Sequence, residues 1–156
     1  MLSKLPKKLN AFTLIELLVV IGILAILLAI VLVAINPSRQ FKQANDTQRK
    51  SDVNAILNAI HQYAADNKGD LPSAITASEQ SISNSAADLC GDIVPQYIAD
   101  LPLDPTAGTK DPTDAVCTGA TSYDTGYKVV KSATNNRVTV SATPEITPPS
   151  TIQVTR

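Results

Sequence analysis

The sequence has no tryptophan, a single histidine and only two cysteines among its 156 residues. It therefore lacks the ligands for a zinc site and shows no nucleophile–base–acid set, and it has no Gly-rich phosphate loop. We expect no enzymatic activity from such a chain. The one histidine, His61, has no obvious metal or catalytic partner, and we interpret it as a partly exposed structural residue.

The chain also lacks an overall charge of one sign, since its formal net charge is −1. This balance argues against a globally basic nucleic-acid-binding protein. The charges are nevertheless segregated. Residues 1–50 contain seven Lys or Arg and two acids, residues 51–127 contain two Lys and eleven acids, and residues 128–156 contain four basic residues and one acid. The basic residues 1–50 and the acidic residues 51–127 indicate a chain that is oriented relative to a partner or a surface. The acidic segment argues against nucleic acid as that partner.

One long apolar run stands out. Residues Leu17–Ile35 contain no charged side chain and no hydroxyl group, and nineteen helical residues span roughly 28 Å, the thickness of one bilayer core. A buried helix of a soluble domain is the alternative, and so is a cleaved secretory signal, although Leu32-Val33-Ala34 places Leu where such a signal needs a small residue. The lysines Lys4, Lys7 and Lys8 precede the run and favour a cytoplasmic N-terminus. We predict a single-pass protein of the cytoplasmic membrane with an exported C-terminal head.

A second helical segment follows a break. Pro37 removes a backbone N–H and crowds the preceding turn, so we predict a hinge at this residue. Apolar residues then recur at steps of three and four from Val53 to Ala64, which predicts an amphipathic continuation of the helix over residues 36–68. The sequence Lys68-Gly69-Asp70-Leu71-Pro72 supplies a basic end, a Gly cap and a Pro stop.

The remainder of the chain is rich in Ser, Thr, Asp and Pro and has short apolar runs. Residues 127–130 and 137–142 are the best predicted strands, joined as a hairpin through Asn135-Asn136. We expect a small antiparallel sheet to pack on the helical stripe, within a globular head over residues 69–142. Residues 143–156 form either a flexible tail or a late edge strand. The fold class is therefore α+β, with a long N-terminal helix packed on a small antiparallel sheet.

Glu16 lies at the very edge of the apolar run. A carboxylate drawn into hydrocarbon costs a few kcal/mol, so it either faces the lipid headgroups or has a partner. Around it the sequence reads Ala11-Phe12-Thr13-Leu14-Ile15-Glu16-Leu17-Leu18-Val19-Val20-Ile21, after a short Lys-rich leader. This string resembles the N-terminal signature of type IV prepilins and type II secretion pseudopilins.

The resemblance implies a processing and assembly mechanism. Residues 1–11 would be a leader peptide that prepilin peptidase removes by cutting between Ala11 and Phe12, although Ala11 stands where the family usually has Gly. Phe12 would then be N-methylated. Glu16 would neutralise the amine of a neighbouring subunit, and residues 12–35 would be the transmembrane and assembly helix. A buried carboxylate and a buried ammonium are each costly alone but tolerable as a pair.

The function implied is that of a structural subunit, a pilin or pseudopilin, in a type IV pilus-like or type II secretion filament. Its partners would be copies of itself or related pilins, prepilin peptidase, the inner-membrane assembly platform and the bilayer. The filament would lie at the cell surface or in the periplasm. Two further segments, Asn67–Pro72 and Tyr97–Pro105, are similar to the helix end and the Pro-rich loop of this family. The alternative is a membrane-anchored extracytoplasmic binding module whose acidic loops bind calcium or another ligand, and substitution of Glu16 distinguishes the two.

Three sets of residues in the exported part remain. If the head is exported, Cys90 and Cys117 are expected to form a disulfide, because a metal site needs more ligands than two thiols. Some secretion pseudopilins bind calcium in a loop of this domain, so a calcium site is an alternative to simple solvation for the acidic loop residues Asp100, Asp104, Asp111, Asp114 and Asp124. The basic residues Arg39, Lys42, Arg49 and Lys50 contact lipid headgroups or a neighbouring subunit, or form a solvated face. No other cofactor is expected.

Overall fold

The structure is a computed structural model that describes residues 12–111, 115–118, 122–146 and 151–156. The chain forms two compact units, Met1–Gln40 and Phe41–Arg156. Helix α1 (Leu14–Ala34) belongs to the first unit, and helix α2 (Pro37–Asp66) begins there and continues into the second. The second unit is the head, whose described residues add a short helix and five strands to α2.

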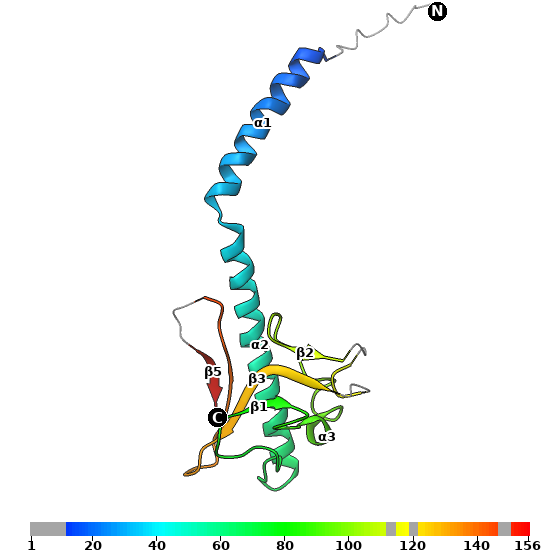
Figure 1. The fold of residues 1–156 in the computed structure, drawn as a ribbon, viewed down its shortest axis with the longest axis vertical. Coiled ribbons are helices and arrows are strands. Elements are labelled where there is room, and N and C mark those ends of the chain that lie inside the picture. The colour runs from blue at the N-terminus through cyan, green and yellow to red at the C-terminus, as the bar shows by residue number, and fades with distance from the viewer. Residues whose placement is uncertain (1–11, 112–114, 119–121, 147–150) are drawn as a thin grey trace, which may run out of the picture. The chain divides into compact units, whose positions relative to one another are not determined.

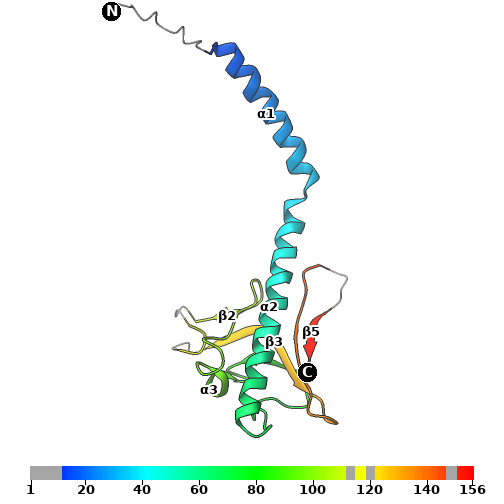
Figure 2. The same ribbon diagram turned by 180° about the vertical axis from the view of Figure 1, so that it is seen from behind.

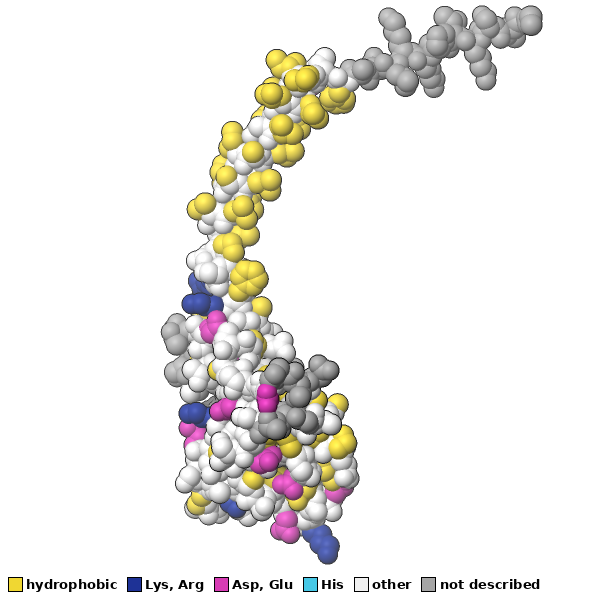
Figure 3. All heavy atoms as spheres, turned by 45° about the vertical axis from the view of Figure 1, so that its right-hand side comes forward, with side chains coloured by type: hydrophobic (Ala, Val, Ile, Leu, Met, Phe, Trp, Pro, Cys, Tyr) yellow, Lys and Arg dark blue, Asp and Glu magenta, His cyan; other side chains and the backbone are white. Residues whose placement is uncertain are grey.

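Helix α1 is apolar on every side. Its mean hydropathy of 3.5 over 21 residues makes it long and apolar enough to cross a membrane, and none of its residues is buried. Figure 3 shows hydrophobic side chains over the whole visible length of this helix. A soluble helix hides one apolar stripe, whereas a helix that is apolar all round needs hydrocarbon or other helices on all sides.

The break between the two helices centres on Asn36. This residue has a positive φ of 42°, a conformation that Asn tolerates better than most residues and that commonly ends a helix. Asn36 also begins the next helix, since its side-chain oxygen accepts hydrogen bonds from the Ser38 hydroxyl and the Arg39 N–H. Pro37 is the first residue of α2, where its missing N–H costs no hydrogen bond.

The head is an antiparallel sheet packed on α2. The strands are β1 (Gln80–Ser83), β2 (Thr109–Lys110), β3 (Tyr123–Lys131), β4 (Val138–Ala142) and β5 (Ile152–Thr155), with the short helix α3 (Cys90–Ile93) between β1 and β2. The strand order is β1-β3-β4-β5, and β2 also pairs with β3. Figures 1 and 2 show β3 crossing α2 in both views. The α+β class with a long N-terminal helix and a small antiparallel sheet is thus confirmed.

The core lies between the sheet and one side of α2. Alternate residues of β3 and β4 point inward, so Tyr127, Val129, Val138 and Val140 are buried together with the apolar stripe of α2. The stripe contributes Val53, Ile56, Leu57, Ala59, Ile60 and Ala64. The β3–β4 hairpin lies where the sequence places it, with Val129 opposite Val140. Of the two alternatives for the end of the chain, residues 152–155 form the edge strand β5 against β4.

Candidate functional site

The N-terminal end of α1 is closed by a reciprocal cap between Thr13 and Glu16. The Glu16 Oε2 atom accepts hydrogen bonds from the Thr13 backbone N–H at 2.9 Å and from the Thr13 hydroxyl at 2.7 Å. In return the Glu16 N–H donates to Thr13 Oγ1 at 3.3 Å. This capping box satisfies N–H groups that the first turn of a helix leaves free. Within the described residues, the other carboxylate oxygen, Oε1, accepts no hydrogen bond.

One side of the first turns of α1 combines this carboxylate with apolar side chains. Glu16 borders a shallow hollow that is also lined by Phe12, Ile15, Val19 and Val20. Phe12 is 81% exposed. Glu16 is the only charged residue of α1. A single acid therefore sits near the end of a helix whose remaining surface is suited to hydrocarbon or to other apolar helices.

This arrangement can be compared with known families. The family model of the prokaryotic N-terminal methylation motif matches residues 6–32. The chain carries the prepilin-type N-terminal signature. The matched range contains Ala11, Phe12 and Glu16 and reaches almost to the end of α1. Searches of the curated proteins and of the solved structures found no match.

The structure places the residues of the prepilin-type signature as follows. Ala11 lies outside the described residues, Phe12 directly precedes the capping residue Thr13, and Glu16 is in the first turn of α1. Cleavage before Phe12, its methylation and the assembly role of Glu16 stay predictions. The predicted hinge residue Pro37 begins α2, one residue after the positive-φ Asn36.

The prediction for the basic cluster was wrong for Arg49. This side chain is 1% exposed and is among the largest fully buried side chains of the head. It therefore contacts neither headgroups nor solvent. Arg39, Lys42 and Lys50 are exposed, as the sequence suggests. The physical reason is the helical repeat, because Arg49 lies four residues before Val53 on the side of α2 that faces the head.

Arg49 is held by three carboxylates, one from α2 itself and two from distant parts of the chain. Its Nε and Nη2 atoms donate to the two oxygens of Asp104 at 2.6 and 2.9 Å. Its Nη1 atom donates to Asp46 at 2.7 Å, and Nη2 also reaches Glu145 at 3.0 Å and the Thr106 hydroxyl at 2.7 Å. The two-pronged contact with Asp104 has the geometry in which Arg–carboxylate pairs are strongest. The Arg49 cluster (Arg49, Asp46, Asp104 and Glu145) thus ties α2 to two loops.

The electrostatics of the cluster follow from these contacts. Burial by itself raises the pKa of Asp104, but hydrogen bonds from Arg49 and from the N–H groups of Thr106 and Ala107 outweigh it and lower the pKa to about 2. Burial opposes the ionised form of Asp46 too, and N–H donors of Glu145 and Ile146 lower its pKa. All these groups are therefore charged near neutral pH.

The acidic loop residues do not converge on a cation site in the described part of the chain. Asp104 is 4% exposed and bound to Arg49, so the prediction of a solvated loop residue is wrong at this position. Asp100 accepts hydrogen bonds from the Val116 and Cys117 N–H groups, and Asp124 accepts from Ser81. Asp114 lies outside the described residues. Among those that are described, no three His, Cys, Asp or Glu side chains form a group that could hold a metal.

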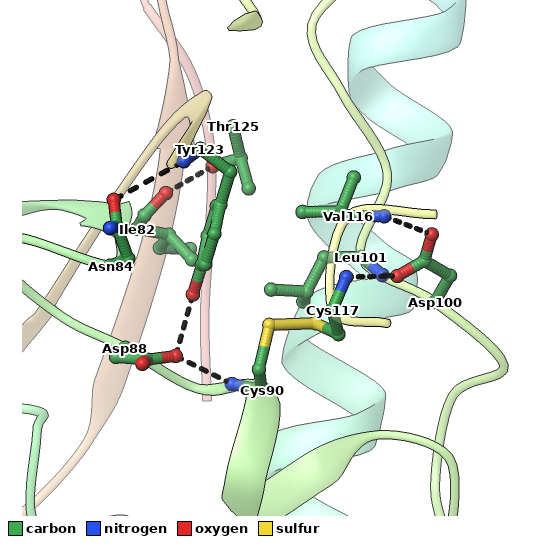
Figure 4. The surroundings of a disulfide bond; sticks show 10 residues. All are labelled: Ile82, Asn84, Asp88, Cys90, Asp100, Leu101, Val116, Cys117, Tyr123 and Thr125. Carbon is green, nitrogen blue, oxygen red and sulfur yellow. Dashed lines mark hydrogen bonds between the residues drawn. A yellow bond between two sulfur atoms is a disulfide. The ribbon is translucent and has the colours of Figure 1, made fainter. Parts of the chain in front are cut away.

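A disulfide joins the two cysteines of the chain. Cys90 begins α3, and Cys117 lies in the loop between β2 and β3, with Cα atoms 5.2 Å apart. Figure 4 shows the bond beside Asp100, whose carboxylate points at the N–H groups of Val116 and Cys117. The disulfide and Asp100 together fix a loop that has few apolar side chains to hold it.

His61 is half-buried on α2, next to the apolar stripe. Its Nε2 atom is buried and finds no hydrogen-bond partner in the described part of the chain. The interpretation of His61 as a structural residue stays a prediction.

Proposed function

We propose that this chain is the precursor of a filament subunit, a pilin or pseudopilin, that is stored in the cytoplasmic membrane and assembled through α1. The prepilin-type signature at residues 6–32 supports a precursor of this kind. The proposal covers both type IV pilus-like and type II secretion filaments, because the signature is common to the two. Its partners are prepilin peptidase, the assembly platform, the bilayer and other subunits.

The observation that carries the proposal is the wholly exposed, apolar surface of α1 with one carboxylate near its start. Hydrocarbon covers such a helix in the membrane, and the helices of neighbouring subunits cover it in a filament. Glu16 is costly in either apolar setting unless a positive group pairs with it. The amine that cleavage creates at Phe12 of a neighbour is such a group, and the Oε1 atom of Glu16 is open to it.

Substitution of Glu16 tests this mechanism. Glu16→Gln keeps the size of the side chain and removes its charge, so the variant should be processed and held in the membrane but absent from sheared filaments. Thr13→Ala is the matched control, because it removes the cap and leaves the carboxylate in place. We expect this control to assemble. Filaments of Glu16→Gln at the wild-type level would contradict the pairing mechanism. Absence of the wild-type chain from sheared filaments would favour a membrane-anchored binding module.

A further inference from the structure

The first turns of α2 expose an aromatic side chain between two basic ones. Phe41 is 72% exposed, although the rest of α2 buries its large apolar side chains or carries polar ones. Arg39 and Lys42, two residues before it and one residue after it in the sequence, are exposed too. The two basic residues are three positions apart and share a side of the helix, whereas Phe41 lies on another side. In the described part of the chain neither of the two basic residues takes part in an ion pair, whereas Arg49, two to three turns further on, is paired with three carboxylates. We call Arg39, Phe41 and Lys42 the neck residues.

The charge around the neck residues is of one sign. No Asp or Glu occurs between Glu16 and Asp46. A helix face that is merely solvated gains from mixed charges, because opposite charges three or four residues apart stabilise a helix. A purely basic stretch with an exposed phenyl ring instead has the composition of a segment at a membrane surface, where the ring enters the boundary of the acyl chains and the cations meet phosphate groups.

The position of the neck residues along the chain agrees with a membrane surface. Helix α1 has 21 residues, about 31 Å of helix, which matches a hydrocarbon core of about 30 Å. The neck residues begin five residues after its last residue, Ala34. Phe41 lies seven residues after Ala34 along the chain, about 10 Å in helical form, so the ring is within reach of the headgroup layer next to the end of α1. Long Arg and Lys side chains extend this reach further.

We propose that the neck residues bind the surface of an anionic phospholipid bilayer, with the Phe41 ring within the headgroup layer and the Arg39 and Lys42 cations on lipid phosphates. The inference rests on the proposed function in one respect, that α1 spans the membrane. It adds a second, electrostatic attachment to the precursor. This attachment holds the start of α2 at the bilayer until the subunit is withdrawn into a filament.

The absence of tryptophan from the sequence makes a direct test simple. A single tryptophan is introduced into the full-length chain as Phe41→Trp, and Gln48→Trp is the control because Gln48 is exposed on the same side of α2 two turns later. Each variant is reconstituted into vesicles of phosphatidylcholine alone or of phosphatidylcholine with phosphatidylglycerol. Emission wavelength and quenching by lipids brominated near the headgroup report the depth of the side chain.

We expect Phe41→Trp to emit at shorter wavelength and to be quenched several-fold more than Gln48→Trp, most strongly with phosphatidylglycerol. Adding Arg39→Gln and Lys42→Gln to Phe41→Trp should remove the additional blue shift and quenching that phosphatidylglycerol causes. Adding Lys50→Gln and Lys68→Gln, which neutralise two exposed lysines further on, should leave both unchanged. The inference would be overturned if Phe41→Trp had the emission wavelength of tryptophan in water. It would also be overturned if quenching were the same with and without phosphatidylglycerol. A blue shift that grows with protein density in both lipids would overturn it in favour of contact with a second copy.

Failure of the inference is distinguishable from failure of the proposed function. Leu24→Trp places the probe in the middle of α1, and lipids brominated near the ends of their acyl chains then report insertion alone. Deep quenching at this position with a water-exposed Phe41→Trp refutes lipid binding by the neck residues and leaves the membrane-held precursor intact. An unquenched Leu24→Trp refutes membrane insertion itself.

Discussion

Arg49 is the side chain whose removal should most damage the head. Arg49→Met keeps an unbranched apolar stem but deletes the guanidinium that three carboxylates share. Asp104 would then be a charged group that is 4% exposed and has no cation beside it. Removing one partner of a buried ion pair costs about 3–5 kcal/mol. Domains of this kind are stable by only about 5–15 kcal/mol, so about a fifth or more of the stability should be lost.

The loss is measurable as a shift in melting temperature. The intact chain in detergent micelles is heated while near-UV circular dichroism of its tyrosines reports the packing of the head. At roughly 4 °C per kcal/mol, Arg49→Met should melt about 12–20 °C below the wild type. Lys50→Met is the control, since Lys50 is the exposed neighbour and surface substitutions usually stay within about 0.5 kcal/mol.

A second substitution separates the buried charge from the lost packing. In the Arg49→Met background, Asp104→Asn removes the most buried of the orphaned charges and should recover part of the loss. A melting temperature of Arg49→Met equal to that of the control would refute the reasoning, because it would mean that the Arg49 cluster adds no net stability.

Three further perturbations act on single features of the head. Asp104, with a pKa of about 2 against about 3.9 unfolded, stabilises the head by about 2.6 kcal/mol above pH 4. Melting temperatures measured at stepped pH should show this stability being lost as the pH falls from 4 through 2. Asp104→Asn should lose less over the same range, because only Asp46 and Glu145, whose pKa values are also lowered, then contribute. Reducing the Cys90–Cys117 disulfide, which closes a loop of separation 27, should cost about 3.5 kcal/mol; equal melts with and without reductant would contradict this. Gly126→Ala should cost about 1–3 kcal/mol, because φ is 77° and the added Cβ would lie 2.7 Å from Asp104 Cβ. Gly91→Ala, whose Cβ meets nothing within 4 Å, should melt like the wild type.

The helices α1 and α2 and the β3–β4 hairpin could be predicted from the sequence, because the apolar pattern of each lies within one short stretch of the chain. The apolar run gives α1, the three-and-four spacing from Val53 gives the buried side of α2, and alternation gives the β3–β4 hairpin. The strands β1 and β2 could not be predicted in this way. They are four and two residues long, and such short polar segments are strands only because β3 provides their hydrogen-bond partners.

The Arg49 cluster was missed for a different reason. Asp104 and Glu145, which pair with Arg49, lie 55 and 96 residues away along the chain. No local sequence pattern therefore predicts these pairs. One local signal was available. Asp46, Arg49 and Asp52 continue the buried stripe of α2 toward its start at steps of three, and charged residues on a buried face indicate pairing with each other or with loops.

The central claim, that this chain is processed as a prepilin and exported into a filament, is tested most directly by mass spectrometry of its N-terminus. Sheared surface material and membranes of the native host are analysed separately for intact mass and N-terminal fragments. The account predicts a chain in the sheared fraction that begins at Phe12 and carries one methyl group on its amine. A full-length chain that begins at Met1 and occurs only in the membrane fraction would contradict it.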